Sequence, residues 1–279
     1  MPRTRHLLAA LVATIAVVVA ACGSSAASPL TDPSEILTKS LTSLDGIKTA
    51  HLQLDLSGKV SADLTGTGSS GQLDLAGTNA TVDLDVAGKK LHAVGSVPAA
   101  LNTGGEVIVT ADAVYYKLTG PLSQSDKFTK LPMSSLSGSV PSLSPNPSAS
   151  GAAAAAIDEI QKALGQLPNK PTLQASQKCG DADCYDVQIK VSAADLAKLD
   201  PSLASQAPAQ GSATVDIFAR TDNLRPAKLV IALDAGSQGS VTLTVNATYD
   251  GSVNIQAPSA DQVTEGTGGF PFPIPSIMP

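Results

Sequence analysis

The sequence predicts an α+β protein built on one long antiparallel sheet of about ten strands, which curls and has its hollow covered by helices. Short apolar runs with period-two alternation recur at about ten-residue spacing, and most of them end at glycine. Predicted helices are grouped before and between two sets of strands instead of alternating with them. A flat sheet of that size would expose its apolar face, and therefore the sheet must curl.

The N-terminus has the anatomy of a removable signal peptide, predicted over residues 1–21. Arg3 and Arg5 form a basic start, and an unbroken apolar segment follows from Leu7 to Ala21. As a helix, that segment would be about 22 Å long, short of the roughly 30 Å hydrocarbon core of a bilayer. A permanent membrane-spanning helix is the weaker interpretation.

The apolar segment ends in Val19-Ala20-Ala21-Cys22, which resembles the bacterial lipobox. Small residues before the cysteine are accepted by the signal peptidase, and the Cys22 sulfur carries a diacylglycerol. Its acyl groups, such as palmitate, anchor the protein in the membrane. The alternative is a chance cysteine after an ordinary signal peptide. Residues 22–33 then form a flexible tether. We expect a lipid-anchored protein on the extracytoplasmic side of the cell membrane.

Charge excludes one class of partner. Removing residues 1–21 from the 279-residue chain leaves 258 residues, and it removes Arg3 and Arg5 from 18 basic residues against 24 acidic ones. The resulting net charge of −8 argues against nucleic acid, which requires a concentrated basic surface. The sequence also has no polybasic segment that would bind anionic lipids, and we therefore expect the acyl anchor to hold the protein at the membrane.

The segment CGDADCYD holds the two cysteines that remain, Cys179 and Cys184. An even pair in an exported chain predicts a disulfide, here closing a hairpin or loop and contributing about 2 kcal/mol. The alternative is a metal loop formed by Asp181, Asp183 and Asp186. It lacks the glycine and distal glutamate of a calcium loop, and no histidine is near. We expect no metal and no cofactor.

The first half of the domain begins with a helix capped by Asp32 or Ser34, with Ile36 and Leu37 on its apolar stripe and Gly46 at its end. The period then changes to two, which predicts strands. The predicted strands are 52–56, 73–75, 82–86, 90–97, 105–111 and 112–118.

In the second half, residues 134–151 are rich in Ser and Pro and predict a long mobile loop. A helix is expected over 152–167, and a shorter one begins at Ser192. The predicted strands are 184–191, 214–220, 229–233, 241–245 and 252–258. Residues 34–258 thus form a single domain, and residues 259–279 an irregular, proline-rich tail.

Catalytic motifs are not evident. Gly66 to Gly71 spells G-x-G-x-x-G, but a strand-like segment follows where a dinucleotide site needs a helix, which favours a hairpin turn. His51 and His92 lie on the polar phase of their strands, and neither accompanies a nucleophile motif. We expect a protein that is not an enzyme.

The apolar phase of the strands is the remaining candidate site. Most such side chains are ordinary core, but an incompletely closed sheet would leave a cavity without charges or rings, suited to a fatty chain. Each buried methylene contributes about 0.8 kcal/mol, so part of one acyl chain gives useful affinity. The candidate lining residues are Leu52, Leu54, Leu56, Val82, Leu84, Val86, Val107, Val109, Leu229, Ile231, Leu233, Val241, Leu243 and Val245.

The layout resembles the actinobacterial cell-envelope lipoprotein family of LppX, LprA, LprF and LprG. The matching segments are the lipobox at Cys22, the helix leading into 48–51, the strand 113–118, the segment 184–187 with the helix at 192–196, and the strand 249–258. The resemblance implies a curved antiparallel half-barrel, with helices in its concave side and an apolar cavity, similar to the LolA and LolB carriers.

The resemblance also implies function. A monomeric carrier would bind multi-chain envelope lipids or glycolipids and move them away from the inner membrane, in concert with a membrane lipid exporter. The family usually has a tryptophan where this chain has Ser125-Asp126-Lys127-Phe128, and the mouth of the cavity is expected to differ. Two alternatives stay open: a structural surface lipoprotein with a closed core, and an envelope-stress sensor on the same fold.

Overall fold

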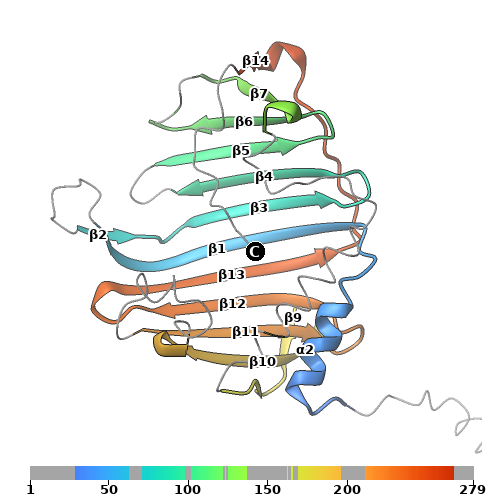
Figure 1. The fold of residues 1–279 in the computed structure, drawn as a ribbon, viewed down its shortest axis with the longest axis vertical. Coiled ribbons are helices and arrows are strands. Elements are labelled where there is room, and N and C mark those ends of the chain that lie inside the picture. Colours follow the sequence, from blue (N-terminus) through green and yellow to red (C-terminus); the bar gives the residue numbers. More distant parts are fainter. Residues whose placement is uncertain are drawn as a thin grey trace, which may run out of the picture. The chain divides into compact units, whose positions relative to one another are not determined.

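The computed structural model describes residues 29–62, 71–97, 102–121, 123, 125–136, 162, 165, 169–195 and 211–266. Within them, fourteen strands form one sheet (Figure 1). The strands are β1 Thr49–Ala62, β2 Gly71–Asp74, β3 Thr78–Asp85, β4 Lys90–Val97, β5 Thr103–Val109, β6 Ala113–Thr119, β7 Phe128–Pro132, β8 Thr172–Leu173, β9 Gln177–Cys179, β10 Ala182–Ser192, β11 Ser212–Arg220, β12 Pro226–Asp234, β13 Gly239–Tyr249 and β14 Val263–Glu265. One α-helix is described over its whole length, α2 Pro33–Thr42, and there are 3₁₀ turns at η1 Met133–Leu136, η2 Gly236–Gln238 and η3 Ala260–Gln262.

The sheet consists of two meanders joined at its centre. Its order is β14-β7-β6-β5-β4-β3-β1-β13-β12-β11-β10-β8, with β2 paired to β1 and β9 paired to β10. All pairs are antiparallel except β14 with β7, which is parallel. The predicted antiparallel sheet is confirmed. The sheet has more strands than the predicted ten or so, because β8 and β9 are too short to show alternation.

Two expectations for the C-terminal part are wrong. Residues 252–258 were predicted as a strand, but they form an irregular segment that leads from β13 at the centre of the sheet to β14 at its edge (Figure 1). Residues 263–265, assigned to an irregular tail, form β14. Two contacts to β7 hold that strand: the Thr264 hydroxyl donates to the carbonyl of Phe128 at 3.2 Å, and Lys130 pairs with Glu265 at 3.0 Å.

Helix α2 begins as predicted, because the Asp32 carboxylate accepts hydrogen bonds from the backbone amides of Ser34 at 2.8 Å and Glu35 at 3.4 Å. Its buried side chains Ile36 and Leu37 face the sheet end formed by β10 and β11. The sheet is open, with β14 and β8 as its edges. The predicted curl into a half-barrel with helices in a concave side is therefore not confirmed.

The remaining predicted helices are described only in part. Of residues 152–167, Lys162 and Gly165 are described and are helical, as are residues 193–195 of the helix expected after Ser192. Ser192 and Asp195 form a capping box, in which the Ser192 hydroxyl donates to the Asp195 carboxylate at 2.6 Å and accepts from its amide at 3.2 Å. The signal peptide, Cys22 and residues 137–151 of the loop lie outside the described residues.

Candidate functional site

Strand register brings the candidate lining residues to one face of the sheet. Directly opposed residues of antiparallel strands share a face, and Leu54 of β1 lies opposite Val245 of β13, which in turn lies opposite Leu229 of β12. The same holds for Leu52 with Val82. We call this side of the sheet the apolar face. Thirteen of the fourteen candidates lie on it, namely Leu52, Leu54, Leu56, Val82, Leu84, Val107, Val109, Leu229, Ile231, Leu233, Val241, Leu243 and Val245.

Val86 is the exception, because it follows the end of β3 and lies 49% exposed in the turn to β4. The alternation in two other strands identifies residues that the sequence-based list missed. Leu91 and Ala93 of β4 lie opposite Leu84 and Val82, and Val215 of β11 lies opposite Ile231. The apolar face thus extends without a break from β6 to β10.

The apolar face has no charge at its centre. On β1, β3 to β6 and β11 to β13, the positions of this face within the described pairs hold aliphatic residues, glycine, threonine and tyrosine. A charged group would be costly to desolvate in an apolar site, whereas these side chains gain free energy when apolar surface covers them. The face is chemically suited to hydrocarbon.

Burial on the apolar face differs between its ends and its middle. Leu131 and Val114 on one side and Val187 and Ile189 on the other are buried. On the central strands β1, β3, β12 and β13, the candidate residues are only half-buried, and Leu233 is 45% exposed. The ends of the face are therefore packed core, while its middle retains apolar surface that a ligand could cover.

The opposite side of the sheet, which we call the polar face, holds both histidines of the described chain. His51 contacts Asp83 at 2.6 Å, and His92 contacts Glu106 at 2.9 Å, each between neighbouring strands. Neither histidine faces a serine or cysteine in these pairs. Their predicted place on a polar strand face is confirmed.

Phe128 also lies on the polar face, buried in a cluster with Ile108 and Ile255. The missing tryptophan in this stretch predicts an altered mouth of an apolar cavity. That expectation is wrong for the Phe128 ring, because the ring lies on the other side of the sheet from the candidate residues. The C-terminal segment covers it, with Ile255 as the buried contact.

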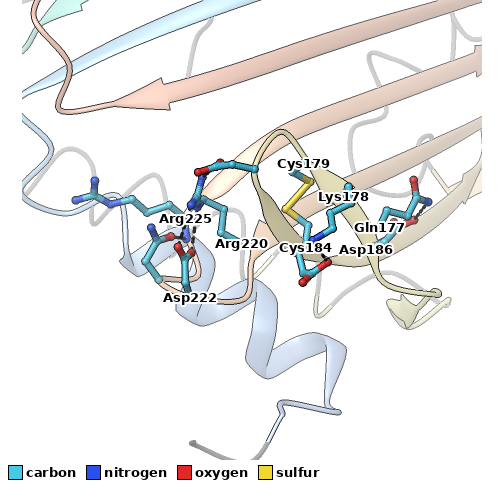
Figure 2. Close-up of a disulfide and its surroundings, with 11 residues drawn as sticks. Gln177, Lys178, Cys179, Cys184, Asp186, Arg220, Asp222 and Arg225 are labelled. Carbon is cyan, nitrogen blue, oxygen red and sulfur yellow. Dashed lines mark hydrogen bonds and ion pairs between the residues drawn. A yellow bond between two sulfur atoms is a disulfide. The ribbon is translucent and has the colours of Figure 1, made fainter. Parts of the chain in front are cut away.

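Figure 2 shows the predicted disulfide between Cys179 and Cys184, which closes the β9–β10 hairpin with a Cα–Cα distance of 5.9 Å. The carboxylates of the alternative metal loop have other partners. Asp181 pairs with Arg220 at 3.1 Å, and Asp183 with Lys178 at 2.9 Å. Within the described residues, no three His, Cys, Asp or Glu side chains gather to hold a metal ion.

Arg220 beside this hairpin also binds Asp222 at 2.9 Å, a hydrogen-bonded pair that raises the pKa of the guanidinium and lowers the pKa of the Asp222 carboxyl. Asp186 of β10 behaves differently. It accepts a hydrogen bond from Gln177 at 2.9 Å (Figure 2), and burial, reinforced by repulsion from Asp216, raises its pKa. Gln177, Asp186 and Arg220 lie on β9, β10 and β11 at the end of the sheet, and Asp222 lies in the turn that follows β11.

The glycine motif of residues 66–71 ends where β2 begins at Gly71, and β2 pairs antiparallel with β1. A strand follows the motif, as the hairpin interpretation predicts, although residues 63–70 lie outside the described part of the chain. None of the described helices is long and apolar enough to cross a bilayer.

Comparison with solved structures finds the following similarities. The chain is similar to lipoprotein LppX of Mycobacterium tuberculosis, with 16% identity, a TM-score of 0.46, and coverage of 80% of this chain and 98% of that one. It is similar to LprF of Mycobacterium bovis, with 19% identity, a TM-score of 0.44, and coverage of 83% and 99%. A LolA-superfamily protein of Nitrosomonas europaea matches at 12% identity and a TM-score of 0.23, over 78% and 92%.

The first two bear names from the family that the sequence resembles. No protein-family model and no curated protein matches the sequence. Similarity at this level assigns neither a ligand nor an activity to this chain.

Proposed function

We propose that this protein is a non-catalytic, membrane-anchored lipoprotein that binds the acyl chains of envelope lipids or glycolipids on its apolar face and carries them from the inner membrane toward the outer envelope. The observation that carries the proposal is the charge-free middle of that face, where side chains such as Leu54, Ile231 and Leu243 are half-buried. Covering such surface with methylene groups is favourable, at about 0.8 kcal/mol for each one buried.

Several further elements belong to the same proposal. Lipidation of Cys22 after removal of residues 1–21 would place the domain on the extracytoplasmic side of the cell membrane. A membrane lipid exporter would supply the ligand, and the domain would act as a monomer. Curling of the sheet into a half-barrel, with helices covering a concave apolar side, would convert the open face into a cavity.

The proposal is tested by filling the middle of the apolar face. The double variant Leu54→Phe/Leu243→Phe adds two rings to neighbouring central strands, β1 and β13. It should abolish uptake of a fluorescent diacyl lipid and change the melting temperature little, because half-exposed positions have room. In a closed core the same overpacking costs about 1–3 kcal/mol at each site.

Two controls separate the interpretations. Thr244→Phe places a ring next to Leu243 in sequence but on the polar face, and should leave lipid uptake unchanged. Val187→Phe overpacks a fully buried residue of the apolar face and should lower the melting temperature. If the double variant destabilises the protein as Val187→Phe does, and the unmodified protein takes up no lipid, the structural lipoprotein with a closed core is the better description.

A further inference from the structure

The polar face has a groove at the end of strands β4, β5 and β6, of about 440 Å³. Its floor carries the Glu106 carboxylate and the Lys117 ammonium group, and its walls include the hydroxyls of Ser96 and Thr119 and the exposed aliphatic side chain of Val94. These charged and hydroxyl groups occupy the opposite side of the sheet from the proposed lipid surface. A ligand bound there would meet different chemistry from one bound on the apolar face.

Glycine keeps the groove open. A Cβ atom added at Gly104 would lie 2.9 Å from the Thr119 hydroxyl and 2.8 Å from the carbonyl of Gly95. A side chain at this position would therefore fill the space in front of the Thr119 hydroxyl. Gly120, with a φ of +84°, allows the chain to turn at the end of β6. The backbone at the ends of these strands therefore determines the shape of the groove.

The two charges of the floor are held in place. Lys117 lies 3.3 Å from Glu106, and Glu106 also contacts His92 at 2.9 Å. The Lys117 ammonium lies 4.4 Å from the centre of the Phe128 ring, a cation–π contact. The side chains of Glu106 and Lys117 are each 26% exposed, which leaves one edge of each available to the groove.

This arrangement selects against charged ligands. An anion near Lys117 would also meet the Glu106 carboxylate 3.3 Å away, and a cation near Glu106 would meet the ammonium group. A hydrocarbon would have to desolvate both charges and the wall hydroxyls without replacing their hydrogen bonds. A neutral ligand with several hydroxyl groups can instead donate to the carboxylate and accept from the ammonium group at the same time.

We propose that this groove binds a neutral sugar. Neighbouring hydroxyls of one ring would bridge Glu106 and Lys117, while Ser96 and Thr119 complete the hydrogen bonds at the wall. The volume lies within the range of about 300–1,000 Å³ that small-molecule sites occupy. The sugar could belong to a free envelope glycan or to the head group of a glycolipid. The site lies on the polar face and does not depend on lipid binding to the apolar face.

The test uses the full-length protein and two kinds of probe. One is an array of lipid-free neutral, sulfated and amino-sugar oligosaccharides. The other is a pair of vesicle preparations of phosphatidylcholine, one of which also contains a neutral glucosyl diacylglycerol. We expect capture by neutral sugars, in the array or specifically by the glucosylated vesicles, and these two results distinguish a free glycan from a lipid head group.

Variants connect that binding to the groove. Glu106→Gln should lower it at least about tenfold and Thr119→Val about fivefold, since hydrogen bonds to charged groups contribute about 1.5–3 kcal/mol and those between neutral groups about 1. Glu265→Gln and Thr244→Val make the same chemical changes outside the groove and should bind like the unmodified protein. Circular dichroism verifies that each variant is folded.

Three results would overturn the proposal. They are preference for sulfated or amino sugars, absence of neutral-sugar binding in both formats, and binding by folded Glu106→Gln and Thr119→Val at the unmodified level. Lipid uptake by the apolar face, measured separately with the diacyl probe, should be unchanged in both groove variants. Failure of the sugar site and failure of the lipid site are thereby distinguishable.

Discussion

Asp186→Asn should stabilise the protein at neutral pH. Asp186 is only 4% exposed. One of its carboxylate oxygens has no hydrogen-bond partner among the described residues, and the other accepts a hydrogen bond from the Gln177 amide. Burial first, and then repulsion from Asp216, raises the pKa of this carboxyl above its ordinary value of 3.8. The amide of Asn resembles the neutral form of the acid.

The size and pH dependence follow from this environment. An uncompensated buried polar group costs about 1–3 kcal/mol, and 1 kcal/mol shifts the melting temperature by about 2–4 °C in a domain of this size. Because the pKa of Asp186 is raised in the folded state, this carboxyl group contributes to the free energy of unfolding in full below pH 3.8, and the contribution is lost as pH rises through the raised pKa. The advantage of Asn should therefore be small at low pH and reach several degrees at pH 7.

Thermal unfolding followed by circular dichroism, at intervals from pH 3 to 8, measures the difference. Asp55→Asn is the matched control, because Asp55 is an exposed aspartate on the same polar face and its replacement should leave the curve within about 0.5 kcal/mol of the unmodified protein. A lower melting temperature for Asp186→Asn at pH 7 would refute the reasoning. It would mean that attraction to Lys228 outweighs desolvation of the carboxylate.

The remaining predictions concern the anchor, the disulfide, the C-terminal segment and the helix cap. Cys22→Ser should release the protein from membranes with its β-rich circular dichroism unchanged, and continued partition into the detergent phase would contradict lipidation. Alkylation without reductant should label neither Cys179 nor Cys184 in the intact mass, whereas two labels would mean free thiols. Ile255→Ala should cost about 2–5 kcal/mol in urea unfolding, because Ile255 of the C-terminal segment is buried against Ile108 and Phe128 of the sheet. Asp32→Ala should cost about 0.5–2 kcal/mol by loss of the α2 cap.

The sequence predicts strands well where one face of the strand is buried and the other is exposed to solvent. The run from Leu52 to Leu56 shows this alternation, and it lies in β1 with its leucines on the apolar face. It also predicts the α2 cap, since an Asp before a proline and an apolar stripe is a local signal. These features depend on neighbours in the chain, which a sequence displays directly.

Segments whose structure depends on distant partners were predicted poorly. Residues 252–258 alternate like a strand, yet they lie outside the sheet, and Ile255 packs on Ile108 and Phe128 instead of pairing in a ladder. Residues 263–265 lack a strand pattern but pair with β7. The candidate site shows the same division. Alternation identifies which residues share a face, but only their solvent exposure in the folded chain shows that the ends of the face are buried and its middle is half-buried.

The position of β1 at the centre of the sheet has a consequence for how the chain acquires its structure. Its neighbour β13 lies almost at the other end of the sequence, with Ala50 opposite Tyr249. The central pair cannot form until nearly the whole domain has been synthesised, and the loop that must close is about 200 residues long. Contacts of such long sequence separation make folding slow. The two halves of the sheet therefore cannot join in a nascent chain until its last long strand, β13, has been made.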